Sequence, residues 1–411
     1  MRLLAIAAML IVASCARTGG VATKQVTATT TPTPYSVAPP SSASSPSPSP
    51  SPSVLASPTP PPAPSVTCLQ GVIPAFQAVI TGSNGIFIYD VGDPVHPRVI
   101  CRIANTYVHI LTGTSFEYLA PQLDGTTEVV LHALGSNNES VAARLMANLI
   151  APSTSWVGPV AGTRDFGTLA YMAGGGVDAS GFDATDVWVA TPSGRTRIFS
   201  YGVPGKDAFG RPGFAPETLS FSSDGEYLAA GWSVATKPVH VFRVSDGANV
   251  SPTLPADFRF AFWSKTGATL YIVGNTSVSQ WTPGSSITAL STIPWTLEPS
   301  FSPDGAEVAF TIVTSTHQVR TYVYDLTGRS SRLLVDQPRS SAVFVKTGWV
   351  WEMEEKPCVQ SSNSACFDPT VPDGKVLAVD LATGRETAVV FASGESPSTY
   401  GLAAGDLWPK S

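Results

Sequence analysis

The acidic residues Asp183 and Glu352 have the side-chain chemistry for acid–base catalysis. Glycoside hydrolysis uses such a pair, in which one carboxyl group protonates the leaving oxygen and the other acts as base or nucleophile. The two residues lie far apart in the sequence, so only the fold can bring them together. The sequence has no Gly-x-Ser-x-Gly elbow, His-Glu-x-x-His, phosphate-binding glycine loop or dinucleotide fingerprint. It therefore offers one candidate pair and no catalytic motif.

Four of the five cysteines group into two local pairs. Cys68 and Cys101 lie in the N-terminal part of the folded region, and Cys358 and Cys366 share one short polar segment. Four cysteines allow three pairings, and we predict the local ones as the simplest. A metal site is the alternative for the same residues. Because neither pair has a neighbouring histidine or a Cys-x-x-Cys spacing, we expect no metal, and no cofactor is predicted.

The fifth cysteine, Cys15, follows an apolar N-terminal segment. Arg2 precedes the stretch Leu3–Val12, which at about ten residues is too short for the ~20 that a membrane-spanning helix needs. The residues Val12-Ala13-Ser14-Cys15 resemble the lipobox at which bacterial lipoproteins are cleaved and acylated. The resemblance implies lipidation of Cys15 and attachment to a membrane through the lipid. An ordinary secretory signal cleaved nearby is the alternative.

Residues 16–66 have the composition of a disordered linker. They carry repeated Ser-Pro and Thr-Pro dipeptides and almost no charge. Such a segment cannot bury enough apolar surface to order itself. We therefore predict a lipoprotein signal peptide at 1–15, a linker at 16–66 and a folded domain at 67–411.

The composition of the whole chain favours an all-β protein. Only 13% of its residues are charged, and it contains 35 glycines and 36 prolines, which favour turns over helices. The net charge is -6, and lysines and arginines do not cluster, so we expect no nucleic-acid partner. A folded region of about 345 residues exceeds the usual size of a single hydrophobic core, which favours a modular architecture.

A unit of four apolar strands recurs along the folded region. It is clearest at 219–230 and 299–310, which contain Phe-Ser-Ser-Asp-Gly and Phe-Ser-Pro-Asp-Gly before an apolar strand. These two segments resemble the TolB-type β-propeller repeat, and weaker copies occur at 262–267 and 344–348. The resemblance implies a β-propeller. An aspartate before glycine in this motif is expected to shape a turn, and strand aromatics are expected to pack between blades.

Two series of glycines measure the repeat. The first turn of each unit contributes Gly113, Gly167, Gly225, Gly267, Gly305, Gly348 and Gly405. The second turn contributes Gly92, Gly135, Gly194, Gly247, Gly284, Gly328 and Gly384. Members of the first series are about 49 residues apart on average, somewhat above the usual ~40 to 45 residues of a propeller blade. We predict a seven-bladed β-propeller, with six or eight blades as alternatives.

The two glycine series are offset at the ends of the chain. The first unit, at 85–94, lacks an opening strand, whereas the C-terminal segment 399–405 has an opening strand and little after it. Closing a propeller ring removes exposed sheet edges that would otherwise template aggregation. We therefore expect the C-terminal strand to complete the N-terminal blade.

The predicted blades place their long connections on one face of the disc. The resemblance implies that first-to-second and third-to-fourth turns share one face, while all other connections lie on the other. The long irregular segments are of the second kind, and loops gathered on a rigid scaffold are frequent binding sites. These segments are 173–186, 201–217, 233–238, 312–320 and 353–375. On and beneath them lie the candidate binding residues Asp178, Phe182, Asp183, Lys206, Phe209, Arg211, His317, Trp351 and Glu354.

Mixed charges and aromatic side chains on this face are typical of protein or carbohydrate recognition. We expect a monomeric, non-catalytic propeller, anchored outside the cytoplasm through Cys15, that binds a protein or a cell-envelope polymer. One alternative is a hydrolase or lyase that acts on extracellular glycan or peptide through Asp183 and Glu352. Another is an envelope-assembly scaffold like the TolB-type proteins, since propellers host both enzymes and binding modules.

Overall fold

The structure is a computed structural model that divides the 411-residue chain into the units Met1–Pro60 and Pro61–Ser411. All residues described below belong to the second unit. They are 63–74, 77–82, 85–104, 108–111, 114–122, 126–146, 156–163, 165, 167–177, 183–191, 193–202, 218–231, 239–295, 299–313, 319–359 and 370–392. In these ranges no helix has the length and apolar character needed to span a membrane.

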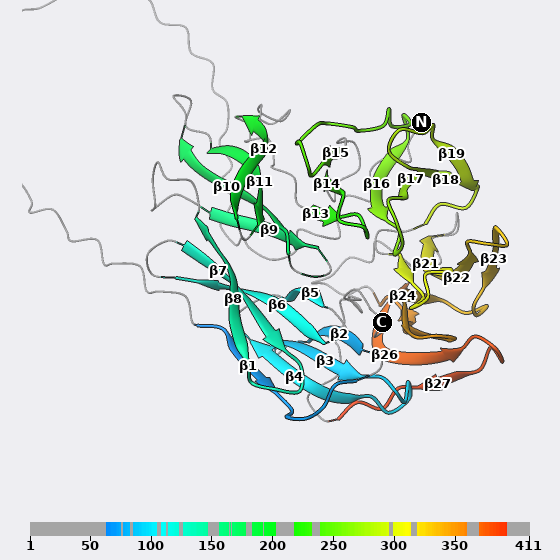
Figure 1. The fold of residues 1–411 in the computed structure, drawn as a ribbon. Coiled ribbons are helices and arrows are strands. Elements are labelled where there is room, and N and C mark those ends of the chain that lie inside the picture. Colours follow the sequence, from blue (N-terminus) through cyan, green and yellow to red (C-terminus); the bar gives the residue numbers. More distant parts are fainter. Residues whose placement is uncertain are drawn as a thin grey trace, which may run out of the picture. The chain divides into compact units, whose positions relative to one another are not determined.

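Seven antiparallel sheets form the blades of the domain (Figure 1). Blade 1 contains β1 (Ser65–Cys68), β2 (Gln77–Gly82), β3 (Gly85–Asp90) and β4 (Arg98–Ala104). Blade 2 contains β5 (Val108–Leu111), β6 (Ser115–Pro121), β7 (Thr126–Ala133) and β8 (Glu139–Met146). Blade 3 contains β9 (Trp156–Gly162), β10 (Leu169–Val177), β11 (Asp183–Thr191) and β12 (Gly194–Gly202).

The C-terminal four blades repeat the same pattern. Blade 4 has three strands, β13 (Thr218–Phe221), β14 (Tyr227–Gly231) and β15 (His240–Arg243). Blade 5 contains β16 (Phe258–Trp263), β17 (Leu270–Gly274), β18 (Val278–Trp281) and β19 (Thr288–Ser291). Blade 6 contains β20 (Ser300–Phe301), β21 (Glu307–Val313), β22 (Val319–Asp325) and β23 (Ser330–Leu333). Blade 7 contains β24 (Arg339–Lys346), β25 (Trp349–Pro357), β26 (Thr370–Asp380) and β27 (Glu386–Ala388). The predicted all-β, seven-bladed propeller is confirmed.

The aspartate of the repeated motif shapes the first turn of a blade, as predicted. In blade 6 the Ser302 hydroxyl donates to Asp304 Oδ1 at 2.6 Å, and that oxygen also accepts the backbone N–H of Ala306 at 3.1 Å. Gly305 has a φ of 71°, a conformation that side-chain-bearing residues rarely adopt. The first turn of blade 4 repeats these bonds through Asp224. The motif therefore carries turn chemistry and not a ligand site.

Aromatic strand residues fill the seams between blades, which also agrees with the prediction. Between blades 5 and 6, the Phe301 ring lies 5.7 Å from the Tyr271 ring, measured between centroids. Trp295 is 1% exposed and packs on Tyr271 and Phe310 from the two blades. Burying one such side chain contributes about 1.5–3 kcal/mol of hydrophobic stabilisation.

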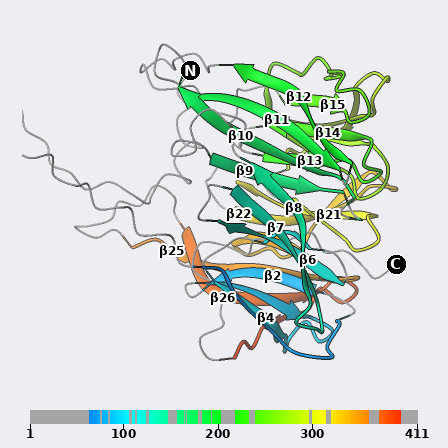
Figure 2. The ribbon, with the colours of Figure 1, turned by 60° about the vertical axis from the view of Figure 1, so that its left-hand side comes forward.

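Hydrogen bonds between turns define one face of the propeller. In blade 6 the Leu326 N–H, after the third strand, donates to Ala306 O in the first turn at 3.0 Å. Blade 7 has the equivalent bond from Leu381 to Gly348 at 2.9 Å. First and third turns thus share a face, here called the turn face. The opposite loop face receives the ends of β10 and β25, which point to the left-hand side of Figure 2.

The turn face shows which position each strand of blade 1 occupies in the four-strand repeat. The ammonium group of Lys346, beside the first turn of blade 7, donates to Gly92 O at 3.0 Å. Gly92 joins β3 to β4, so this connection lies on the turn face and β3 is the third strand of its blade. Accordingly β2 and β4 are the second and fourth strands, and the described part of blade 1 has no opening strand, as predicted. The segment 399–405 that we expect to supply it lies outside the described residues.

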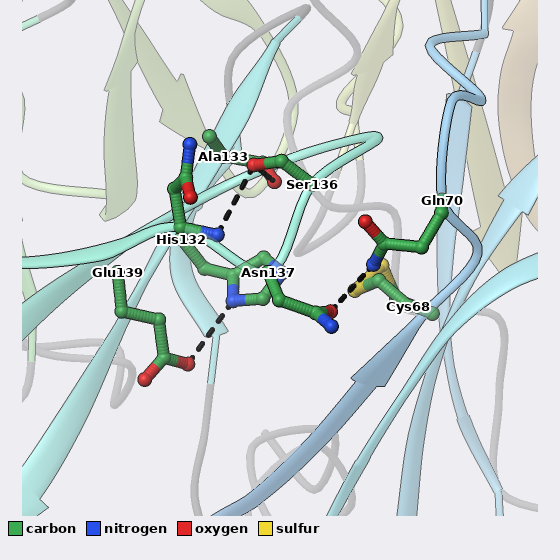
Figure 3. The surroundings of a disulfide bond; sticks show 9 residues. Cys68, Gln70, His132, Ala133, Ser136, Asn137 and Glu139 are labelled. Carbon is green, nitrogen blue, oxygen red and sulfur yellow. Dashed lines mark hydrogen bonds and ion pairs between the residues drawn. A yellow bond between two sulfur atoms is a disulfide. The ribbon is translucent and has the colours of Figure 1, made fainter.

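The sequence did not predict the outermost strand of blade 1. Strand β1 begins at Ser65, two residues before the predicted domain start, and pairs with β4 in addition to the usual strands. The predicted disulfide between Cys68 and Cys101 joins these two strands. Beyond it, Gln70 donates to Asn137 Oδ1 at 2.6 Å (Figure 3). The Gly71 N–H donates to Gly135 O at 2.7 Å. The N-terminal strand is thus fastened to blades 1 and 2.

Candidate functional site

The predicted binding residues fall into two groups. Asp178, Phe182, Lys206, Phe209, Arg211 and His317 lie outside the described residues. Asp183 is the first residue of β11, and only its backbone is described. Trp351 and Glu354 lie in β25 of blade 7, where the side chains are described. The described part of the predicted face is therefore concentrated in blade 7.

The segment 353–375 is not one long loop, as the sequence analysis expected, but largely a β-hairpin. Strand β25 continues to Pro357, and β26 begins at Thr370, its register partner. We call residues 353–359 and 370–375 the blade 7 arm. The wrong prediction has a physical reason, because charged residues at these positions mask the strand alternation of apolar and polar side chains.

Charged pairs across the two strands hold the blade 7 arm together. Lys375 lies 2.9 Å from Glu354 Oε2, and Lys356 lies 2.7 Å from Asp373 Oδ1. Opposite charges across neighbouring strands each contribute roughly 0.2–1 kcal/mol. Cys358, beyond the end of β25, is disulfide-bonded. Its predicted partner Cys366 lies outside the described residues, so this pairing stays a prediction.

Trp351 is 1% exposed and is not part of an accessible surface. Its indole N–H donates to Pro94 O in blade 1 at 2.8 Å, and its ring contacts Phe391 edge-on at 5.7 Å. A buried tryptophan needs a partner for its N–H, and the seam between blades 7 and 1 supplies one. The proposed binding role of Trp351 is thereby corrected to packing between these blades.

Below the arm, four polar side chains meet in the seam between blades 6 and 7. We call them the Glu352 cluster: Thr321 of β22, Arg339 of β24, Glu352 of β25 and Glu386 of β27. Arg339 binds both oxygens of Glu386, at 2.8 and 3.3 Å. Its Nε also lies 3.4 Å from Glu352 Oε1, and the Thr321 hydroxyl donates to Glu352 Oε2 at 2.6 Å. One guanidinium group therefore serves two carboxyl groups.

Burial dominates the electrostatics of the Glu352 cluster. Glu352 is 0% exposed, and its burial raises the pKa to about 8, although the bond from Thr321 and the charge of Arg339 lower it. Burial also acts to raise the pKa of Glu386, but the hydrogen bonds with Arg339 and Glu352 and the charges of Arg339 and Lys375 together outweigh it, so the pKa is lowered. At neutral pH the cluster thus holds an ionised Glu386 and a protonated Glu352.

The candidate catalytic pair does not share a blade. Asp183 begins β11 in blade 3, whereas Glu352 lies in β25 of blade 7, and two blades separate them by the shorter way around the ring. The Glu352 carboxyl group is buried and engaged with Thr321 and Arg339. A general acid must reach the substrate oxygen directly or through one water molecule. The described geometry of Glu352 therefore favours a role inside the fold.

In the described ranges, no three or more histidine, cysteine, aspartate or glutamate side chains are placed to hold a metal ion. The sequence analysis named Glu352 but not Arg339, Glu386 or Thr321. These residues come from four strands spread over 66 positions of the chain, from 321 to 386. Only strand register places them together, and no pattern in the sequence indicates the cluster.

Neither a search with protein-family models nor a search of curated proteins found a match. Among solved structures, the chain is similar to the β-propeller domain of the Trilobed protease from Pyrococcus furiosus, with 12% identity and a TM-score of 0.43. That match covers 70% of this chain and 86% of the other. TolB from Acinetobacter baumannii matches with 12% identity and a TM-score of 0.35, over 81% of this chain and 80% of TolB.

A puromycin-hydrolyzing peptidase from Mycobacterium tuberculosis gives 13% identity and a TM-score of 0.46. The match covers 80% of this chain and 55% of the peptidase, so the chain spans about half of that protein. Similarities this distant carry no argument about activity, and the proteins matched include enzymes and non-enzymes. The seven-bladed fold rests on the sheets described above.

Proposed function

We propose that the protein is a lipid-anchored, extracytoplasmic β-propeller that binds a protein or a cell-envelope polymer without catalysis. In this proposal Cys15 carries the lipid, residues 16–66 form the linker, and the loop face of the propeller binds the partner. The propeller acts as a monomer. The disulfide between Cys68 and Cys101 supports export, because disulfides persist in oxidising compartments outside the cytoplasm.

The blade 7 arm is the observation that carries the binding proposal. The arm consists of the parts of β25 and β26 that extend beyond the innermost strand β24. Strand β24 begins at Arg339, which pairs with Glu354, whereas β25 and β26 remain paired as far as Pro357 and Thr370. The arm presents charged side chains on a hairpin whose strands two ion pairs hold together, and Cys358, beyond the end of β25, is disulfide-bonded. A preorganised hairpin loses little conformational entropy when it binds, which favours affinity.

The test is capture of envelope components on the full-length chain and on an arm variant. The variant replaces residues 358–369 by Asn-Gly, which joins the register partners Pro357 and Thr370 through a two-residue hairpin turn. This change removes Cys358 and Cys366 together and leaves no unpaired thiol. The control removes the exposed Arg243–Asp246 pair on the turn face by alanine substitution.

Isolated cell-wall polymer and membrane proteins are the two probes. We expect one of them to bind the unchanged chain and the Arg243/Asp246 control, and to be lost from the arm variant. Binding that survives in the arm variant would contradict a site that needs the end of the hairpin beyond Pro357 and Thr370. Turnover of a glycan or peptide by the unchanged chain would contradict the non-catalytic function.

A further inference from the structure

The N-terminal strand β1 enters the propeller at the loop face. Strand β4 follows the Gly92 connection on the turn face, so it runs toward the loop face and ends there at Ala104. Strand β1 is antiparallel to β4, and its first residue, Ser65, is the register partner of Ala104. The chain before Ser65, which contains the predicted linker, therefore joins the domain at the edge of the loop face. Tension in the linker would reach the domain through β1.

The backbone pairing of β1 is by itself a weak attachment. The strand pairs through four residues with β4, at the outer edge of blade 1, and its side chains are half-buried or exposed. Each of its backbone hydrogen bonds contributes only about 1 kcal/mol. Tension applied to the N-terminal end of such a strand can peel it from the sheet. The disulfide between Cys68 and Cys101 adds a covalent link at the other end of β1.

The disulfide encloses the part of blade 1 that closes the ring. Strands β24 and β25 and the segment after β27 donate hydrogen bonds of 2.8–3.0 Å to three backbone carbonyl groups in the connection between β3 and β4. These carbonyl groups belong to Gly92, Pro94 and Val95. All three lie between Cys68 and Cys101 in the sequence, as do β2 and β3.

A covalent bridge carries tension past the segment that it encloses. Tension that enters at Ser65 reaches Cys68, crosses the disulfide to Cys101 and continues along the chain toward blade 2. Segment 69–100 is then a closed loop beside this path, and its backbone bears no tension. Without the bridge, the tension first meets the hydrogen bonds that fasten 69–71 to β4 and blade 2. It then reaches β2, which pairs with β3 alone in the described part of the chain.

We propose that the disulfide between Cys68 and Cys101 is a tension-bearing staple, which lets the propeller carry tension in its N-terminal linker without opening the ring between blades 7 and 1. Its use in the cell rests on the proposed function, because tension arises when a membrane holds the lipid at Cys15 and a fixed partner holds the loop face. The mechanical property belongs to the domain itself and is measurable without a partner.

Pulling single molecules of the full-length chain with optical tweezers tests the staple. One handle is attached at the N-terminus and the other at position 245, where Ser245 is exposed in the third turn of blade 4. In the Cys68→Ser/Cys101→Ser variant we expect an additional extension step, at a lower force than the one that unfolds blades 2 and 3. Because the two cysteines are 33 positions apart, this step should release about 110 Å of chain. The unchanged chain should show no such step.

The Cys358→Ser/Cys366→Ser variant is the matched control. It removes the other predicted disulfide, which lies outside the part of the chain between the two handles, so it should extend like the unchanged chain. If Cys68→Ser/Cys101→Ser shows no additional step, the proposal is overturned. The same step in the control would also overturn it, because the step would then not depend on the path through Cys68.

A second measurement covers the case in which Cys68→Ser/Cys101→Ser does not fold. In the Cys358→Ser/Cys366→Ser protein, dithiothreitol acts on folded molecules whose one predicted disulfide joins Cys68 to Cys101. A thiolate of the reagent attacks one sulfur atom, and its second thiol then closes the oxidised ring of the reagent, so that both cysteines become thiols. We expect an unchanged circular dichroism spectrum without tension and the additional step under tension. Loss of the folded spectrum without tension would overturn the proposal, because the disulfide would then be required for stability at rest.

The pulling experiment and the capture experiment fail independently. If no envelope component is captured but the additional step is found, the proposed function fails and the staple remains. If capture succeeds and the step is absent, the propeller binds as proposed, but the disulfide does not shield segment 69–100 from tension.

Discussion

Two seams of this propeller each bury one glutamate, and the two carboxyl groups differ in their hydrogen-bond partners. Glu352, between blades 6 and 7, meets a threonine hydroxyl and a guanidinium group. Glu117 of β6 is also 0% exposed, but its two carboxyl oxygens have no hydrogen-bond partner among the described residues. Burial raises the pKa of each to about 8. The same pKa thus arises in a polar cluster and in an apolar seam.

The surroundings of Glu117 follow from strand alternation in β6. Its neighbours Phe116 and Tyr118 pack toward blade 1, so Glu117 lies on the opposite side with Leu119, which packs toward blade 3. That seam is filled by Val129, Leu145, Val160, Leu169 and Tyr171. Nothing described there compensates a charge. The comparison shows that a raised pKa alone does not indicate a functional site, because burial in an apolar seam raises the pKa of Glu117 as much as burial in a polar cluster raises that of Glu352.

Of the changes that separate the two seams, removing Arg339 should lower the free energy of unfolding the most. The Arg339→Met variant leaves the ionised Glu386 without its bidentate partner and removes the positive charge beside Glu352. Breaking a buried ion pair in this way costs about 3–5 kcal/mol of unfolding free energy. Urea denaturation at pH 7 measures it. Arg243→Ala is the matched control, because its pair with Asp246 is exposed and contributes at most about 1 kcal/mol. Equal losses in the two variants would contradict a buried cluster.

Both glutamates should make the folded protein less stable as the pH rises. Their pKa is about 8 in the folded state and near 4.5 in the unfolded chain, so folding binds protons between these values. The stabilisation is complete below about pH 4.5 and is lost as the pH approaches 8. Between pH 6 and pH 8 we expect each glutamate to lose about 2 kcal/mol, so the two together lower the free energy of unfolding in urea by about 4–5 kcal/mol. An unfolding midpoint that rises over this range would refute the raised pKa values.

The Glu117 seam should tolerate loss of its carboxyl group. Glu117→Met replaces an unpartnered polar group by a linear apolar side chain, so we expect stability to increase by about 1–3 kcal/mol at pH 7. Glu117→Gln needs no proton uptake on folding, so it should also gain stability at pH 7, but less than Glu117→Met because it keeps an unpartnered polar group. Urea denaturation of both variants measures the difference. A destabilised Glu117→Met protein would show that this carboxyl group has a partner after all.

The sequence predicted the number of blades and their strand order better than the contacts between blades. Paired turn glycines and the Phe-Ser-Pro-Asp-Gly motif act locally, since Asp304 and Gly305 need only their neighbours to form a turn. They therefore predicted the blade count and the strand offset of blade 1. Strand β1 was missed because it follows a proline-rich segment and pairs outside the four-strand pattern. The disulfide between its Cys68 and Cys101 was nevertheless predicted, because the even number of remaining cysteines and their grouping into two local pairs favoured this pairing.

The candidate site was predicted only in part, because it depends on register. Glu352 and Glu354 were singled out, but which of them is buried depends on the alternation of β25, and the sequence analysis placed the start of the long connection at Met353. Trp351 was predicted to be an accessible binding residue because it is aromatic. Its position in β25 buries it instead. Arg339 and Glu386 meet across the full width of blade 7, a contact that no local pattern indicates.

The smallest predicted effect concerns the one hydrogen bond that joins Glu352 to blade 6. Thr321→Val keeps the shape of the side chain and removes the hydroxyl donor to Glu352 Oε2. We expect a loss of about 1 kcal/mol in urea denaturation at pH 6, typical of one buried hydrogen bond. The bond also lowers the pKa of Glu352, so the variant should shift the pH dependence of stability to higher pH.

Ser251→Ala is the control variant. The Ser251 hydroxyl on blade 4 accepts the Val241 N–H, so its loss should leave the pH dependence unchanged. If Thr321→Val shifts it to lower pH, the hydroxyl stabilises the protonated form, and the electrostatic account of the Glu352 cluster is wrong.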